Sequence, residues 1–452
     1  MTNTTRARLR LRRLDLARAV DDPDVAALRA RLVRRSAVPD DRIRAAVREI
    51  LAGLRADPDR GVRQANERFG GGLPDGRLLL DRATLTQARD ALPGEVRVAL
   101  EAAAANVRRF AETQRPSSST IEVQPGVSIE RRWQPLERVG CYVPGGGAAY
   151  PSTLVMTVVP ARVAGVGVVV VASPAGADGR LDPVLLGAAG LLEVDAFIVA
   201  GGAQAIGALA FGLPGAGIAP VDRIVGPGNA WVTAAKLELA GEVGIDLPAG
   251  PSEGLVLVDR GADPDRAAAD LLTQAEHGPD SPAILVTAEP DLVEPIETAI
   301  LGRLKRAGQR EVLERALADH GWIVVAPDLD SALAFINDYA PEHLSIDVED
   351  LEPTVARIRN AGSVFVGPWA PESAGDYATG ANHVLPTGGL ARSSGALSVE
   401  AYGKYLQVQR ITRDGLEALL PTIRALAEAE GLLAHRDAAE VRFERSTDEA
   451  GR

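Results

Sequence analysis

Gln274 and His277 are three residues apart in the stretch DLLTQAEHGPDS (270–281), and their side chains could hold a metal ion. Residues three apart on a helix lie on the same face, so an amide oxygen and an imidazole nitrogen would be aimed at one point. Donors of these two kinds could form half of a zinc site. The same spacing also fits a solvated glutamine and a histidine that caps the helix end, and spacing alone leaves both interpretations open.

A helix over residues 264–277 would carry this pair. Asp263 has the residue type of an N-cap, and Pro264 suits the first helical position. Gly278 and Pro279 follow the pair and end the helix. The sequence therefore places the amide and the imidazole on the last helical turn, beside a tight loop.

Glu342 and His343 form a second candidate pair in APEHLS (340–345), where Pro341 breaks the preceding helix. Adjacent residues on a loop can both face one pocket. A carboxylate and an imidazole in that position could transfer protons near neutral pH. The alternative interpretation is a pair of surface neighbours.

Two further stretches carry histidines beside acidic residues. The glycine-punctuated loop GDYATGANHVLPT holds Asp376 and His383, and EGLLAH holds Glu430 and His435. His320 ends an ordinary helix pattern, and we interpret it as structural. Four of the five histidines thus lie in glycine-, proline- or acid-marked surroundings.

Three glycine-rich turns follow expected strands and open expected helices, at 145–147, 201–202 and 226–229. Free backbone N–H groups and the helix dipole make such turns the usual place to bind phosphate. None of the three matches the dinucleotide fingerprint G-x-G-x-x-G, and each alone could be a tight connection. Three such turns in one block favour a nucleotide-binding domain.

Alternating strands and helices would position all of these residues. One alternation runs from residue 139 to 241 and a second from 248 to 367. This pattern predicts parallel sheets flanked by helices. We therefore expect an α/β protein with two incomplete Rossmann-like domains built on parallel sheets, and small N- and C-terminal helical segments that pack on a neighbour.

The composition excludes several classes of protein. The 452 residues suffice for two or three domains, and a formal charge of -12 argues against nucleic acid or an anionic membrane as the main partner. The single cysteine, Cys141, excludes an internal disulfide framework and suits a reducing cytoplasm. No apolar run approaches the ~18 residues of a transmembrane helix, so we expect neither a signal peptide nor a membrane anchor.

Eight of these segments together resemble the histidinol dehydrogenase family. In chain order from residue 139 to 435 they are VGCYVPGG, GGAQAI, GPGNAWV, PAGPSE, QAEHGPDS, APEHL, GDYATGANHVLPT and EGLLAH. Each is weak alone, but eight in order are very specific, whereas the first 130 residues resemble the family more loosely. The resemblance implies a cytoplasmic, zinc-dependent enzyme of histidine biosynthesis. It would oxidise L-histidinol to L-histidine through L-histidinaldehyde, with two NAD+.

The resemblance also implies roles for individual residues. The implied zinc ligands, for one ion per subunit, are Gln274, His277, Asp376 and His435. The implied acid/base residues are Glu342 and His343, and the implied NAD contacts are Tyr142, Gln204 and Asn229. The implied substrate contacts are Ser252, Gln274, His277, His343, Asp376, Glu430 and His435. All of these positions carry the expected residue types.

A domain-swapped homodimer is implied as well, in which Glu430 and His435 serve the partner's site. The expected division of the chain has four parts. They are an N-terminal arm (1–25), a main α/β domain with the zinc and catalytic site (26–141 and 252–397), an NAD-binding α/β domain (142–251) and a C-terminal helical segment (398–452). The departures from the family pattern are minor: the connection at 212–221 is rich in glycine and proline, and the tail is polar.

Three other functions remain as alternatives. Cys141 could be the nucleophile of a thiol-dependent aldehyde dehydrogenase, although no base stands near it in the sequence. A relative of the same fold could oxidise another small alcohol, and the presence of Glu430 and Ser252 favours histidinol. A non-catalytic zinc- or nucleotide-binding module would not need the Glu342–His343 pair. NADH absorbance on adding histidinol separates these cases.

Overall fold

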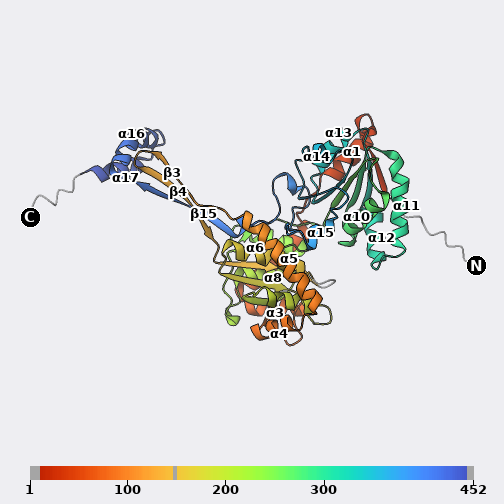
Figure 1. The fold of residues 1–452 in the computed structure, drawn as a ribbon. Coiled ribbons are helices and arrows are strands. Elements are labelled where there is room, and N and C mark those ends of the chain that lie inside the picture. The colour runs from red at the N-terminus through yellow and green to blue at the C-terminus, as the bar shows by residue number, and fades with distance from the viewer. Residues whose placement is uncertain (1–10, 146–149, 445–452) are drawn as a thin grey trace, which may run out of the picture. The chain divides into compact units, whose positions relative to one another are not determined.

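The computed structural model describes residues 11–145 and 150–444 (Figure 1). The chain forms two compact units, one from residues 1–115 and 136–402 and one from residues 116–135 and 403–452. No helix in the described ranges is long and apolar enough to cross a membrane.

The first sheet of the larger unit is six-stranded and parallel, in the order β1-β12-β11-β10-β13-β14. Every residue of β10 (GLVLV) and β11 (AILVT) is buried, as expected for parallel strands covered on both faces. The strands are β1 (Arg12–Asp15), β10 (Gly254–Val258), β11 (Ala283–Thr287), β12 (Gly321–Val325), β13 (His343–Asp347) and β14 (Ser363–Val366).

Helices cover both faces of this sheet. Val256 and Leu285 pack with one group of helices, and their neighbours Leu255 and Ile284 pack with the other. The first group is α10 (Pro264–Glu276), α11 (Val293–Leu304) and α12 (Arg310–His320). The second group is α1 (Pro23–Val33), α13 (Leu329–Tyr339) and α14 (Leu351–Val355). The predicted helix over 264–277 is confirmed, with Asp263 accepting from the N–H of Asp265 as its N-cap.

The second sheet has the order β2-β7-β6-β5-β8-β9, and all its pairs are parallel except β2 with β7. Its strands are β2 (Leu79–Leu80), β5 (Arg138–Tyr142), β6 (Val168–Ser173), β7 (Ala196–Val199), β8 (Arg223–Val225) and β9 (Gly244–Ile245). Helices α4 (Arg82–Asp90), α5 (Gly94–Thr113), α6 (Pro151–Ala164) and α7 (Pro183–Leu191) share one core with it. Helices α2 (Asp41–Ala56), α3 (Pro58–Phe69), α8 (Gly202–Phe211) and α9 (Ala230–Leu239) share the other.

The smaller unit contains an antiparallel sheet in the order β15-β4-β3 and two helices. Its elements are β3 (Ser119–Gln124), β4 (Val127–Pro135), β15 (Gly403–Ile411), α16 (Arg413–Ala429) and α17 (Leu433–Glu440). The predicted hairpin around Pro125-Gly126 is confirmed as β3–β4. Short 3-10 helices complete the chain: η1 (Arg18–Val20), η2 (Pro214–Ala216), η3 (Pro290–Leu292), η4 (Leu390–Arg392), η5 (Val399–Tyr402) and η6 (Val441–Phe443).

Three expectations differ from the structure. Within the expected arm 1–25, β1 is an edge strand of the first sheet, because Leu14 alternates with polar neighbours and is buried. Residues 26–141 are expected in the main α/β domain with residues 252–397, but α2 to α5 and β5 pack with the second sheet. The segment 398–452 is not only helical, since nine of its residues form β15 along β4.

Candidate active site

The predicted catalytic and metal-binding side chains of the larger unit gather at the amino ends of strands in the first sheet. Ser252 and Glu253 directly precede β10, and His343 is the first residue of β13, paired with Gly254. Helix α10 ends at the same edge and carries Gln274 and His277. Ligands of open α/β sheets usually bind beyond the carboxyl ends, whereas these predicted side chains lie at the opposite edge of the sheet.

Gln274 is buried against the start of β10. A Cβ atom on Gly254 would lie 2.6 Å from Gln274 Oε1, so only glycine lets the amide approach the strand this closely. His277 is the C-cap of α10, and its N–H donates to the carbonyl of Gln274. The imidazole keeps 31% of its surface exposed, so it is open to a ligand.

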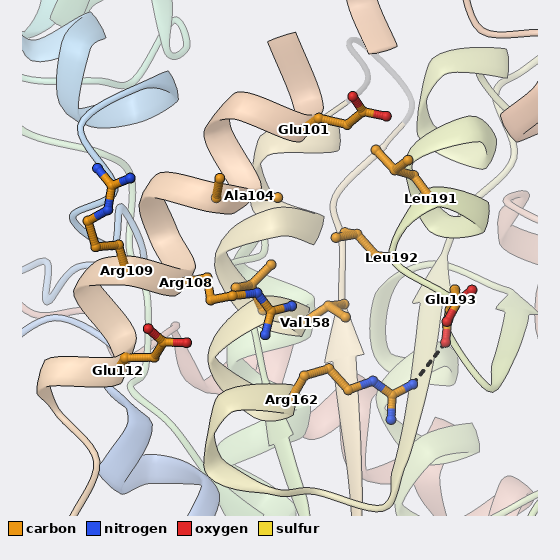
Figure 2. Close-up of a pocket in the computed structure, with 12 residues that line it drawn as sticks. Glu101, Ala104, Arg108, Arg109, Glu112, Val158, Arg162, Leu191, Leu192 and Glu193 are labelled. Atoms are coloured by element: carbon orange, nitrogen blue, oxygen red, sulfur yellow. Dashed lines mark hydrogen bonds between the residues drawn. The ribbon is translucent and has the colours of Figure 1, made fainter. Parts of the chain in front are cut away.

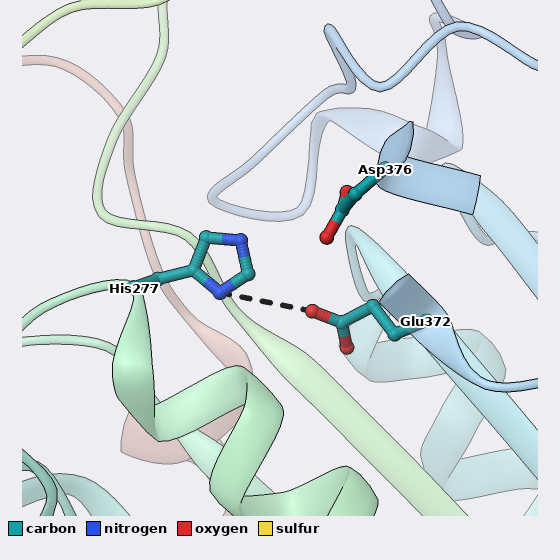
Figure 3. Close-up of side chains that lie close together, drawn as sticks. All are labelled: His277, Glu372 and Asp376. Atoms are coloured by element: carbon teal, nitrogen blue, oxygen red, sulfur yellow. Dashed lines mark ion pairs between the residues drawn. The ribbon is translucent and has the colours of Figure 1, made fainter. Parts of the chain in front are cut away.

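His277 faces two carboxylates of α15 (Glu372–Tyr377), as Figure 3 shows. Ligand atoms of His277, Glu372 and Asp376 all lie within 4.8 Å of one another. Glu372 Oε1 lies 3.7 Å from His277 Nδ1. Among the described residues this buried oxygen has no hydrogen-bond partner. Burial, together with Asp376 and Glu342, raises the pKa of Glu372 well above its usual value.

The sequence interpretation missed Glu372. The signal that could have found it is its spacing from Asp376, because residues four apart on a helix share a face. The glycines of GDYATGANHVLPT predict a loop from residue 375 onward, so the sequence gives no sign of a helix that joins Glu372 to Asp376. Burial also raises the pKa of Asp376, while the nearby His277 lowers it.

His343 has a buried imidazole that is neutral at physiological pH. Its Nδ1 lies 3.2 Å from Gln274 Oε1, 3.7 Å from Glu372 Oε1 and 3.8 Å from Glu342 Oε2. An amide oxygen only accepts, so Nδ1 carries the proton and Nε2 keeps its lone pair. Nε2 is buried and has no hydrogen-bond partner in the described part of the chain. Burial and the neighbouring His277 and His383 hold the pKa of His343 well below its usual value.

Glu342 is linked to Gln274 through a hydroxyl. Ser252 Oγ donates to Glu342 Oε2 at 2.7 Å, and the N–H of Glu253 donates to the same oxygen at 2.9 Å. Gln274 Nε2 in turn donates to Ser252 Oγ at 3.5 Å. Burial raises the pKa of Glu342 to about 8, although both hydrogen bonds to its carboxylate oppose the shift.

The expectation that Glu342 and His343 sit on a loop was wrong for His343, which begins a strand. Ala340, with a left-handed backbone (φ 53°), ends α13, and Glu342 follows in the connection to β13. The strand HLSID is short and almost fully buried between β10 and β14. This ordered backbone fixes the direction of the imidazole better than a loop would.

A buried ion pair holds the segment before β10. Arg35 Nε and Nη2 donate to the two oxygens of Glu253 at 2.8 and 2.7 Å. The N–H of Gly388 donates to Glu253 Oε1 at 3.1 Å. Because the backbone N–H of Glu253 donates to Glu342, this pair also orients the carboxylate of Glu342.

His383 binds the end of α15, the helix that carries Asp376. Its Nδ1 donates to the carbonyl oxygen of Asp376 at 3.1 Å, and Thr153 Oγ1 lies 3.3 Å from its Nε2. Burial lowers the pKa of His383 to about 4, so the ring is neutral at physiological pH. Thr153 lies in the first turn of α6, which links this loop to the second sheet.

Two of the three predicted glycine turns lie at carboxyl ends of strands in the second sheet. Gly201 precedes α8 after β7, and the turn 226–229 joins β8 to α9. Residues 146 and 147 of the third turn lie outside the described residues. The strand order reverses between β5 and β8, which is where open α/β sheets bind ligands.

The predicted NAD contacts surround this edge. Tyr142 is the last residue of β5, and its hydroxyl accepts from the N–H of Gly202 at 3.4 Å. Gln204 is buried on α8 and donates to Asn66 at 3.4 Å. Asn229 is the N-cap of α9. Turns of this kind present backbone N–H groups at helix starts, which fits a dinucleotide pyrophosphate.

The remaining predicted residues belong to the smaller unit. Glu430 is the C-cap of α16, and His435 lies on α17. Both are exposed and outside that unit's own core. Their roles therefore stay predictions.

Two other features carry none of the predicted site residues. Cys141 is fully buried in the second sheet, where burial raises the pKa of its thiol to about 12, so it is no thiolate nucleophile.

A cavity of 710 Å³ lies between α5, α6 and the end of α7 (Figure 2). Its lining contains three arginines and three glutamates, and the other lining residues are alanines, valines and leucines.

Comparison with known proteins identifies similar chains. A family model described as histidinol dehydrogenase matches residues 33–443, a range that includes every predicted site residue. The histidinol dehydrogenases of Parasynechococcus marenigrum and Leifsonia xyli subsp. xyli are 46% and 47% identical, over 83% and 84% of this chain and 86% and 88% of those proteins. The crystal structure of histidinol dehydrogenase from Elizabethkingia anophelis superposes with a TM-score of 0.86 at 34% identity. That match covers 96% of this chain and 98% of the other.

Proposed function

This chain belongs to the histidinol dehydrogenase family, and we propose how its residues carry out that reaction. The protein is an NAD-dependent oxidoreductase that oxidises histidinol in histidine biosynthesis. Our proposal adds the route through L-histidinaldehyde with two NAD+, the zinc site, and a cytoplasmic location in keeping with a single buried thiol. The observation that carries it is the convergence of buried His343 and Glu342 with His277 and Asp376 at one sheet edge.

Zinc would be held by Gln274, His277 and Asp376, with His435 from the partner subunit. Nitrogen and oxygen donors of this kind are typical of catalytic zinc sites. Glu372 Oε1 has no hydrogen-bond partner among the described residues and lies beside His277 Nδ1, which suits an imidazole that binds a cation through its other nitrogen. When bound, the ion would fix the amine and imidazole of histidinol and so orient its alcohol carbon.

His343 acts as the base in both oxidation steps. Its Nε2 lone pair takes the hydroxyl proton as hydride leaves the substrate for NAD+. Glu342 activates the water that adds to the aldehyde, which requires its carboxylate form. The hydroxyl of Ser252 and the N–H of Glu253 hold that carboxylate in place.

The aldehyde step should accelerate as pH rises. Below its pKa of about 8, Glu342 is mostly protonated, so the carboxylate fraction grows about tenfold per pH unit between pH 6 and 7 and levels off above 8. Rapid-mixing kinetics with histidinaldehyde as substrate measure this profile. Glu342→Gln should slow the aldehyde step more than the alcohol step and remove the rise. A variant with the wild-type profile would contradict the assignment.

NAD+ binds at the carboxyl edge of the second sheet, with contacts to Tyr142, Gln204 and Asn229. The order β7-β6-β5-β8-β9 is that of doubly wound dinucleotide-binding sheets and supports a Rossmann-like description. The reversal point lies between β5 and β8, next to Tyr142 and the 226–229 turn. NAD+ bound there would accept hydride from the substrate.

The proposed substrate contacts come from both units. In the larger unit they are Ser252, Gln274, His277, His343 and Asp376. In the smaller unit they are Glu430 and His435, which we assign to the partner's site in a domain-swapped homodimer. The smaller unit supports this assignment, because many large apolar side chains on it are exposed: Ile121, Val123, Leu406, Ile411, Leu426, Leu432, Leu433 and Val441. An apolar surface on so small a unit is typical of a protein interface.

The test of the function is the number of NADH molecules formed per L-histidinol consumed, with and without a chelator. We expect two NADH, loss of activity on chelation, and recovery with zinc, because a bound ion would orient the substrate for both hydride transfers. One NADH with released aldehyde would contradict the four-electron route. Full activity in the metal-free protein would contradict the zinc site.

A further inference from the structure

A buried ion pair holds the turn that leads into α9. Lys236 on α9 and Asp246 after β9 have side chains only 2% and 3% exposed. Lys236 Nζ donates to Asp246 Oδ1 and to the carbonyl oxygen of Gly226, each at 2.5 Å. Asp246 Oδ2 accepts from the N–H of Gly226 at 2.7 Å. Both polar backbone groups of Gly226 are thus bound by one charged pair.

Gly226 opens the 226–229 turn and packs on the end of β5. Its φ is 110°, which favours glycine, and a Cβ atom there would lie 2.1 Å from the carbonyl oxygen of Tyr142. Asn229 closes the turn, and its Oδ1 accepts from the N–H groups of Trp231 and Val232. The turn is therefore held at its first residue by the ion pair and at its last by the helix cap.

Stability of the core is a weak reason for such a pair. Two apolar side chains of similar volume often stabilise a protein as well as a buried ion pair does. Apolar side chains, however, could bind neither the N–H nor the carbonyl of Gly226. The chemistry of Lys236 and Asp246 is matched to the backbone of the turn, and the turn is where the strand order reverses.

We propose that Lys236 and Asp246 are positioning residues for NAD+, which hold the 226–229 turn in its binding conformation before the dinucleotide arrives. The inference rests on the proposed NAD+ site at this sheet edge. A turn ordered in advance loses less conformational freedom on binding, so the pair contributes to affinity without touching the ligand. Because Gly226 is fixed, the N–H groups that follow it in the turn lie at the start of α9. A helix N-terminus of this kind favours a phosphate.

The experiment is the double variant Lys236→Met/Asp246→Leu, with NAD+ binding measured by calorimetry and by KM. We expect the Kd and KM for NAD+ to rise about tenfold or more. The kcat at saturating NAD+, the KM for histidinol and the zinc content should stay near wild type. A merely structural pair would lower the melting temperature without this selective change. The matched control is Arg55→Met/Glu242→Gln, which removes an exposed bidentate pair beside the same sheet.

Two results distinguish a failure of the positioning role from a failure of the proposed NAD+ site. A folded double variant with unchanged NAD+ Kd overturns the inference. Asn229→Asp keeps the capping oxygen and adds a negative charge, so it should weaken NAD+ binding if the dinucleotide lies at this turn. If that variant also binds normally, the proposed NAD+ site is wrong as well.

The wild-type enzyme provides a second measurement if the double variant does not fold. The amide of Gly226 should be protected from hydrogen exchange before NAD+ is added, because Asp246 already binds it. Fast exchange that slows only with NAD+ would show that the ligand orders the turn, and would overturn the inference.

Discussion

Replacing His343 by asparagine should lower kcat of both oxidation steps by about 100-fold or more, while zinc content stays at the wild-type level. The reason is the lone pair on Nε2, which is buried and has no hydrogen-bond partner among the described residues. An asparagine N–H can still donate to Gln274 Oε1, as Nδ1 does now. The substitution therefore removes the base and keeps the hydrogen bond. Single-turnover NADH formation from histidinol and from histidinaldehyde measures the two steps separately.

His320 supplies the matched control, because it is the last residue of α12 and the sequence already marks it as structural. His320→Asn should keep wild-type kcat in both steps. If His343→Asn also keeps it, another group takes the hydroxyl proton. If His343→Asn instead loses zinc, the main role of the ring is to orient Gln274 rather than to accept a proton.

The helix that carries Gln274 and His277 was predictable because its signals are local. Asp263 caps it, Pro264 begins it, and Gly278 follows its end, and each acts within one turn of the chain. The alternation of strands and helices likewise predicted the two parallel sheets and the order in which their strands and helices follow one another in the chain. Strand pairing between distant segments carries no such local signal. Hence the sequence did not show that α2 to α5 pack on the second sheet.

Glu372 and the burial of His343 show what local patterns cannot supply. Glu372 becomes a partner of His277 only because β14 and α15 bring it back to the end of α10. The low pKa of His343 and the pKa of Glu342 near 8 both arise from burial at the amino ends of β10 and β13. These are properties of the three-dimensional arrangement of the strands. Residue types alone predicted a Glu342–His343 pair, but not the burial that shifts the two pKa values.

The smaller unit was the part least accessible from sequence. β15 has a strand pattern in which outward residues are mostly polar, and its partner β4 lies more than 250 residues earlier in the chain. In the smaller unit, the exposed apolar residues Leu432 and Leu433 lie three and two positions before His435 in the sequence. This proximity connects the expected subunit contact with the expected fourth zinc ligand.

Mixing two inactive variants should restore activity if His435 serves the partner's site. His277→Asn and His435→Asn each remove a proposed zinc ligand, so each homodimer should be inactive. In a heterodimer, one site combines both defects and the other combines an intact larger unit with an intact His435. Random pairing of equal amounts makes half of the dimers mixed, so about a quarter of all sites are intact. Co-refolded protein should therefore show about a quarter of wild-type activity and of wild-type zinc content.

The control is a mixture of His277→Asn with Asp376→Asn. Both residues lie in the larger unit and face each other across one cluster, so every site in their heterodimer carries one defect. That mixture should stay inactive under the same refolding conditions. If His435 served its own subunit, the first mixture would stay inactive too, because each of its sites would also carry one defect. Recovered activity in the first mixture alone thus requires an exchange of His435 between subunits.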